Sequence, residues 1–124
     1  MSLDLYTENI LDLYKNPRNK GILKNPTHEF FKNNPLCGDE VTLQFIIRDG
    51  KVTDIKFNGV GCAISMASAS ILTDKIKNLT ITEIKKITKD DILDILHIPI
   101  SPARLKCALL SLDVLRGALE NAWN

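Results

Sequence analysis

The stretch Asn58-Gly-Val-Gly-Cys62-Ala-Ile-Ser-Met-Ala-Ser-Ala-Ser70 marks a sharp change of pattern along the chain. Residues 51–57 before it alternate between apolar and polar, which predicts a strand, whereas residues 63–76 predict a helix with a small-residue face. Gly59 and Gly61 stand at this change, where glycine allows a sharp turn or a close approach. Cys62 is therefore predicted at a helix N-terminus, where free N–H groups and the helix dipole favour a negatively charged sulfur. The alternative is a small buried cysteine without a chemical role.

A second alternating segment, residues 41–47, precedes this strand and predicts its partner. Between the two lies Asp49-Gly50, a dipeptide typical of type I′ hairpin turns. Cys37 lies just before the first of these strands, and Cys62 lies just after the second. Antiparallel pairing brings both positions to the same end of the sheet, so we expect these two cysteines to be neighbours.

The rest of the chain reads mainly as helices. Periodicity predicts helices at about residues 3–15, 81–87, 90–96 and 103–123, and a weak strand at residues 22–31 that Pro26 interrupts. The first helix should end before Asn16-Pro17, because proline disfavours a helical conformation in the residue before it. Thr80 and Thr88 are expected to cap the two short helices, and residues 33–39 are expected to form a loop. Cys107 falls in the first turn or two of the last helix.

The bulk composition is that of an ordinary globular protein. Residues 1–124 are predicted to form one domain, since 44% of the residues are hydrophobic and 25% are charged. A net charge of +1 gives no reason to expect a nucleic-acid partner. The N-terminal residues carry no basic region followed by an apolar run, and no segment is long and apolar enough to span a membrane. A cytoplasmic protein without a membrane partner is therefore expected.

The three cysteines, Cys37, Cys62 and Cys107, are separated by 25 and 45 positions, and no Cys-x-x-Cys pair is present. Disulfides are not expected in a reducing compartment. Asp39 follows Cys37 by two positions, and with the three thiolates it makes a four-ligand set of the kind that selects zinc or iron–sulfur species. A carboxylate exchanges more readily than a thiolate, which suits a carrier better than a structural site. The alternative for Asp39 is a solvated loop acid or a cap at the start of a strand.

Two cations precede the third cysteine. Lys106 and Arg104 are candidates for stabilising the Cys107 thiolate or a bound anion, and the alternative for both is a solvent-facing position. His28 and His97 have no companions at ligand spacing, so neither is expected to bind a metal.

These residues resemble the iron–sulfur cluster assembly scaffolds of the IscU/SufU family, also called NifU N-terminal-like. The matching segments occur in the family's order and spacing over nearly the whole chain: Tyr14-Lys-Asn-Pro-Arg-Asn-Lys-Gly21, Asn34-Pro-Leu-Cys-Gly-Asp39, Gly61-Cys-Ala-Ile-Ser-Met-Ala-Ser-Ala-Ser70 and Arg104-Leu-Lys-Cys107.

The resemblance implies an α+β fold with a small three-stranded antiparallel sheet and helices packed on one face. It implies that Cys37, Asp39, Cys62 and Cys107 converge and hold a [2Fe–2S] cluster, with zinc on the same ligands when no cluster is present. In this family a cysteine desulfurase delivers persulfide sulfur to the scaffold, for which Cys107 and Cys37 are the acceptor candidates here. The cluster then passes to apo iron–sulfur proteins, and the loaded scaffold can form a homodimer. Such a protein is a carrier rather than an enzyme with turnover of its own.

The chain departs from both branches of the family. IscU-type scaffolds carry a histidine before the third cysteine, where this chain has Lys106, and a Leu-Pro-Pro-Val-Lys chaperone segment, where it has Ile100-Ser-Pro-Ala-Arg104. The cations resemble SufU, yet SufU proteins usually carry an insertion between the second and third cysteines, and this chain does not. A zinc-dependent SufU-like sulfurtransferase is therefore the alternative function. A thiol hydrolase or a zinc deaminase is disfavoured, because no Cys–His dyad and no His-x-Glu with Pro-Cys-x-x-Cys pattern occurs.

Overall fold

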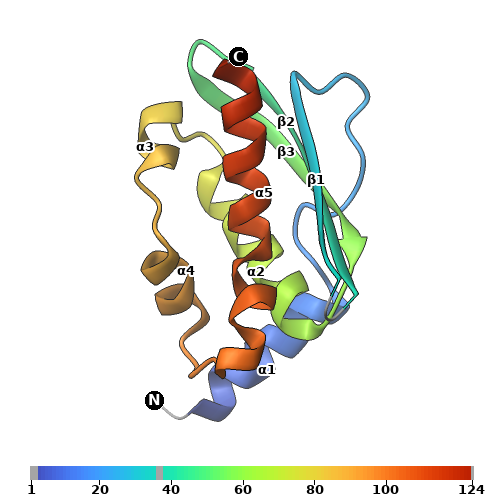
Figure 1. The fold of residues 1–124 in the computed structure, drawn as a ribbon, viewed down its shortest axis with the longest axis vertical. Coiled ribbons are helices and arrows are strands. Elements are labelled where there is room, and N and C mark those ends of the chain that lie inside the picture. Colours follow the sequence, from blue (N-terminus) through green and yellow to red (C-terminus); the bar gives the residue numbers. More distant parts are fainter. Residues whose placement is uncertain (1–2, 36–37, 124) are drawn as a thin grey trace.

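The computed structural model describes residues 3–35 and 38–123. Three strands form one sheet, β1 (His28–Asn34), β2 (Asp39–Arg48) and β3 (Lys51–Val60), in the order β1-β2-β3 with both pairs antiparallel. The helices are α1 (Leu3–Lys15), α2 (Ala63–Ile76), α3 (Ile81–Lys85), α4 (Lys89–Leu96) and α5 (Leu105–Trp123), with a short 3₁₀ turn (Pro102–Arg104) before α5. Figure 1 shows the helices gathered on one side of the sheet, which confirms the predicted α+β fold.

The predicted hairpin is confirmed. Asp49 and Gly50 connect β2 to β3 with positive φ angles of 53° and 76°, as a type I′ turn requires. The register pairs Glu40 with Val60, so the start of β2 and the end of β3 meet at one end of the sheet. The chain passes from there directly into α2.

The first strand differs from its prediction. The segment 22–31 was expected to be extended, but β1 begins only at His28, and Ile22 is 74% exposed. The strand instead continues through Asn33 and Asn34, which were expected to lie in a loop. Backbone pairing with Glu40 and Asp39 of β2 explains this, because a neighbouring strand can extend a polar segment that local propensity does not favour.

The helix boundaries follow local sequence signals. α1 ends at Lys15, just before Asn16-Pro17, as predicted. Thr80 and Thr88 cap α3 and α4 through capping boxes with Glu83 and Asp91. The hydrogen bonds from these two threonines hold the pKa of both carboxyl groups below the usual range.

In the described part of the chain, no helix has the length and apolar character that crossing a membrane would need.

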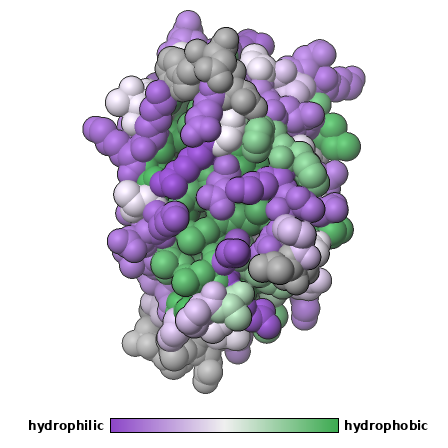
Figure 2. Space-filling view, in the orientation of Figure 1, coloured by the Kyte–Doolittle hydropathy of each residue, from purple (hydrophilic) through white to green (hydrophobic). Residues whose placement is uncertain are grey.

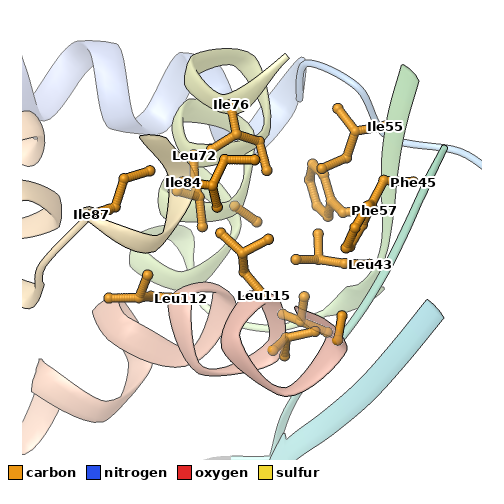
Figure 3. Close-up of a cluster of buried hydrophobic side chains, with 14 of the residues drawn as sticks. Leu43, Phe45, Ile55, Phe57, Leu72, Ile76, Ile84, Ile87, Leu112 and Leu115 are labelled. Atoms are coloured by element: carbon orange, nitrogen blue, oxygen red, sulfur yellow. The ribbon is translucent and has the colours of Figure 1, made fainter. Parts of the chain in front are cut away.

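The main core lies between the sheet and the helices α2 and α5. Figure 3 shows Leu43, Phe45, Ile55 and Phe57 of the sheet pointing toward Leu72 and Ile76 of α2 and Leu115 of α5. Leu112 of α5 lies farther from the sheet, on the side of Ile84 and Ile87. A second cluster joins Ile10 and Leu13 of α1 to α2 and to the segments around Leu96 and Ala108. Together the two clusters hold the starts of α2 and α5 against the end of the sheet.

Removing the Phe57 ring should be strongly destabilising, because this side chain is 0% exposed and the space it leaves cannot be refilled. We expect Phe57→Ala to lower the free energy of unfolding by about 3–5 kcal/mol, measured by urea denaturation. Phe31→Ala is the matched control, since Phe31 is 52% exposed and its loss should cost about 0.5 kcal/mol or less. Equal losses in the two variants would contradict this assignment of the core.

Candidate metal centre

Three of the four predicted ligands converge in space. Asp39 begins β2, Cys62 is the N-cap residue of α2, and Cys107 lies in the first turn of α5. The carboxylate oxygen and the two sulfur atoms all lie within 4.8 Å of one another. The fourth predicted ligand, Cys37, lies outside the described residues. In Figure 1 the starts of β2 and α5 lie at the end of the molecule near α1.

Asp39 holds the turn that carries Cys62. Its Oδ1 atom accepts a hydrogen bond from the Cys62 backbone N–H at 3.1 Å. The Asp39 side chain is only 2% exposed, so the alternative of a solvated loop acid is wrong. The carboxylate instead caps the N-terminus of α2 from the neighbouring strand, which favours its negative charge at the positive end of the helix.

Gly61 makes this close approach possible. A Cβ atom at this position would lie 2.8 Å from Asp39 Oδ1 and 2.5 Å from Ser65 Oγ, distances that real side chains do not tolerate. Sequence reasoning gave Gly61 a role in the turn, but it did not identify the two side chains that fill the space. The sequence signal for this close approach was the glycine directly before the cysteine at the start of a helix.

A pocket of about 360 Å³ opens onto the three ligands. Its lining residues are Gly38, Asp39, Gly61, Cys62, Ala103, Arg104 and Cys107. Cys107 is 4% exposed, whereas Cys62 is half-buried, so the two sulfur atoms differ in their access to solvent. Among the described residues, the pocket gives an ion or a small group a path to the sulfur atoms.

The two predicted cations lie on different surfaces. Arg104 lines the pocket of the three ligands, whereas Lys106 lines a larger neighbouring groove of about 630 Å³ between β1, α4 and α5. Figure 2, drawn in the orientation of Figure 1, shows hydrophobic side chains along the middle of the molecule, with hydrophilic side chains on both sides. Arg104 is thus the better placed of the two to act on the ligands.

The donor set fits a thiophilic metal. Bond lengths of about 2.3 Å to sulfur and 2.0–2.2 Å to oxygen put the ligand atoms of a tetrahedral zinc site about 3.5–3.8 Å apart. The distances between the three ligand atoms, all within 4.8 Å, need to shrink by about 1.3 Å at most. Two sulfur atoms and one carboxylate also match the preference of zinc and iron–sulfur species for thiolate-rich sites.

Neither histidine belongs to this cluster. His97 stacks on Tyr6 with ring centroids 4.5 Å apart and ends α4 in a left-handed conformation. His28 stacks on Phe45 at 5.2 Å, and burial lowers the pKa of His28. Each ring contacts an aromatic side chain, and neither is part of the group of ligand atoms found among the described residues.

Because Asp39 is buried and caps α2, its replacement should cost stability even without a metal. We expect Asp39→Ala to lower the free energy of unfolding of the metal-free protein by about 1–3 kcal/mol, measured by urea denaturation. Asp39→Asn keeps an oxygen that can accept a hydrogen bond from the Cys62 N–H group, so this variant should lose clearly less free energy of unfolding. Equal losses for alanine and asparagine would contradict the capping role.

The different positions of Arg104 and Lys106 should appear in thiol reactivity. In metal-free protein, Arg104→Ala should lower the rate of alkylation by anionic iodoacetate, relative to neutral iodoacetamide, by about two- to five-fold. Lys106→Ala is the matched control and should change this ratio less. Added salt should reduce the effect of Arg104, since both side chains are exposed. A larger effect of Lys106→Ala would reverse the assignment.

Comparison with known proteins identifies the family of the chain. Residues 5–122 match the family described as the NifU-like N terminal domain. The Bacillus subtilis protein named "Zinc-dependent sulfurtransferase SufU" is 42% identical in an alignment that covers 86% of this chain and 84% of that protein. The Archaeoglobus fulgidus protein named "Iron-sulfur cluster assembly scaffold protein IscU 1" is 34% identical over 115 residues, which cover 93% of this chain and 74% of that protein.

Solved structures give the same result. A crystal structure of a putative iron–sulfur cluster assembly scaffold protein for the SUF system from Fervidobacterium islandicum has a TM-score of 0.80 and 31% identity, covering 96% of this chain and 99% of that one. The N-terminal part of a nitrogen-fixing NifU-like protein from Brucella abortus has a TM-score of 0.76 and 25% identity, covering 94% of this chain and 93% of that one. The chain therefore belongs to the NifU-like N-terminal domain family, which includes the IscU and SufU proteins.

Proposed function

We propose that this protein is a scaffold on which an iron–sulfur cluster is assembled and from which the cluster passes to apo-proteins. The observation that carries the proposal is the convergence of Asp39, Cys62 and Cys107, with ligand atoms within 4.8 Å, at an open pocket. A structural metal site is normally closed by four protein ligands and gains nothing from such access. A site that must receive and release its cargo needs an open side.

In this proposal Cys37 completes the ligand set. It lies two positions before Asp39, next to the start of β2. Three thiolates and one carboxylate would hold a [2Fe–2S] cluster as cargo, and the same four groups would hold zinc in its absence. The names of the Archaeoglobus fulgidus and Escherichia coli relatives, iron–sulfur cluster assembly scaffold proteins, support this assignment.

The sulfur would arrive as a persulfide on a cysteine desulfurase. A scaffold thiolate, Cys107 or Cys37, attacks the outer sulfur of that persulfide, a new S–S bond forms on the scaffold, and the desulfurase thiolate leaves. The transferred sulfur must then gain two electrons to become sulfide, so cluster assembly needs an external electron donor as well as iron. Arg104 would stabilise the anionic persulfide within the pocket that it lines.

The second candidate function is a zinc-dependent sulfurtransferase. It is favoured by the 42% identity to the Bacillus subtilis protein that bears this name. In that case zinc holds the thiolates in place and the reaction ends at the scaffold persulfide, which needs no electron donor. Neither candidate turns over a substrate of its own without the desulfurase.

Metal and acid-labile sulfide analysis of protein purified without oxygen separates the two functions. A scaffold should contain iron and sulfide in equal amounts and absorb visible light, whereas a zinc sulfurtransferase should be colourless with one tightly bound zinc. Colourless protein with full zinc and sulfur-acceptor activity would overturn the scaffold proposal.

The ligand assignment is tested by replacing the cysteines one at a time. Each of Cys37→Ser, Cys62→Ser and Cys107→Ser should weaken metal binding by more than about 100-fold, since even an outer-shell change costs 10–100-fold. Competition with a chelator of known affinity measures the loss, and circular dichroism verifies that each variant is folded. An unchanged affinity in one variant would remove that cysteine from the site.

A further inference from the structure

The N-terminus of α2 is capped without the use of the Cys62 sulfur. Cys62 occupies the N-cap position with extended φ and ψ angles of −72° and 169°, yet its side chain makes no capping hydrogen bond. Its N–H group is satisfied by Asp39 from the neighbouring strand. The sulfur is therefore not needed to cap the helix. The groups around it can instead act on the sulfur as a metal ligand.

Ser65 of α2 places its hydroxyl beside that sulfur. Its Oγ atom lies 3.6 Å from Cys62 Sγ and 3.1 Å from the Cys62 carbonyl oxygen, to which it donates. The Ser65 side chain is 1% exposed and also lies against the space that Gly61 leaves open. This hydroxyl is thus held beside one sulfur atom and screened from water.

The one hydrogen of the hydroxyl has two acceptors within reach. While Cys62 is a thiol, its S–H can donate to Ser65 Oγ, and the hydroxyl can donate to the carbonyl. When a metal displaces the thiol proton to solvent, Sγ becomes an acceptor only. The carbonyl still accepts from the Met66 N–H at 3.1 Å, so the hydroxyl can turn to the sulfur without leaving it unsatisfied. Hydrogen bonds to a charged acceptor are the stronger ones.

From this geometry we infer that Ser65 is a positioning residue of the metal centre, whose hydroxyl donates a hydrogen bond to the metal-bound Cys62 thiolate. The bond fixes the direction of the sulfur and withdraws electron density from it, which weakens Cys62 as a donor relative to a thiolate without such a partner. The inference rests on the proposed function, because it requires that Cys62 bind a metal.

The same helix supplies matched controls. Ser68 and Ser70 are also buried, and their hydroxyls have no hydrogen-bond partner among the described residues. Ser68→Ala and Ser70→Ala remove the same atom from the same helix, but their hydroxyls make no hydrogen bond among the described residues, whereas the Ser65 hydroxyl lies beside Cys62 Sγ. They report the effect of losing any buried hydroxyl from α2.

The experiment loads the metal-free protein with Co²⁺ alone and records the sulfur-to-cobalt charge-transfer band. Ser65→Ala should shift this band to longer wavelength, because a sulfur that has lost a hydrogen bond is a stronger donor. Ser68→Ala and Ser70→Ala should leave it at the wild-type position. Ser65→Thr keeps the hydroxyl and should restore the wild-type band, whereas Ser65→Val has the same shape without the hydroxyl and should shift like alanine.

Each outcome bears on the inference. A Ser65→Ala band at the wild-type position, or equal bands for the threonine and valine variants, would overturn it while leaving the proposed metal site intact. Wild-type protein without a charge-transfer band would overturn both. If the alanine variant does not fold, the comparison of threonine with valine decides the question alone.

Discussion

The hydrogen bond from the Cys62 N–H group to Asp39 Oδ1, 3.1 Å long, is the contact on which the centre depends. It joins the start of β2 to the start of α2, and it gives Asp39 two roles. The carboxylate satisfies a helix N-terminus and stays within 4.8 Å of two sulfur atoms. Both roles of Asp39 require glycine at position 61, because a side chain there would occupy the space of the carboxylate.

This arrangement changes the interpretation of Asp39. The sequence suggested a hard, exchangeable ligand in a loop, and on that ground a carrier. The structure adds that the residue is buried and belongs to the framework of the site. A carboxylate has two oxygens and several lone pairs, so capping a helix and binding a metal are compatible. In the proposed metal site, the lability of Asp39 as a ligand would come from the chemistry of oxygen, and its position from the fold.

Most of the fold could be predicted from local signals. The Asp49-Gly50 turn, the proline after α1 and the threonine caps at positions 80 and 88 all act over a few residues, and each prediction was confirmed. The strand β1 was misplaced because its Asn33 and Asn34 are extended only by pairing with β2. For the site, antiparallel pairing predicted that the start of β2 and Cys62 would meet at one end of the sheet. The sequence named Arg104 and Lys106 together as candidates, but it could not tell which of them lines the pocket, and it gave no sign of Ser65, because both points depend on how the chain packs.

The three ligands lie at the starts of three different elements, separated by 23 and 45 positions in sequence. No short segment contains the site, so only the packed chain can present it. An ion bound there closes two long loops, and it adds about 2.7 kcal/mol of stability when its free concentration is 100 times the dissociation constant. Release of the ion removes that contribution. In the proposed function, loading and unloading would therefore also change the tertiary stability of the protein, and an acceptor that takes the cargo would leave behind a chain that opens more easily.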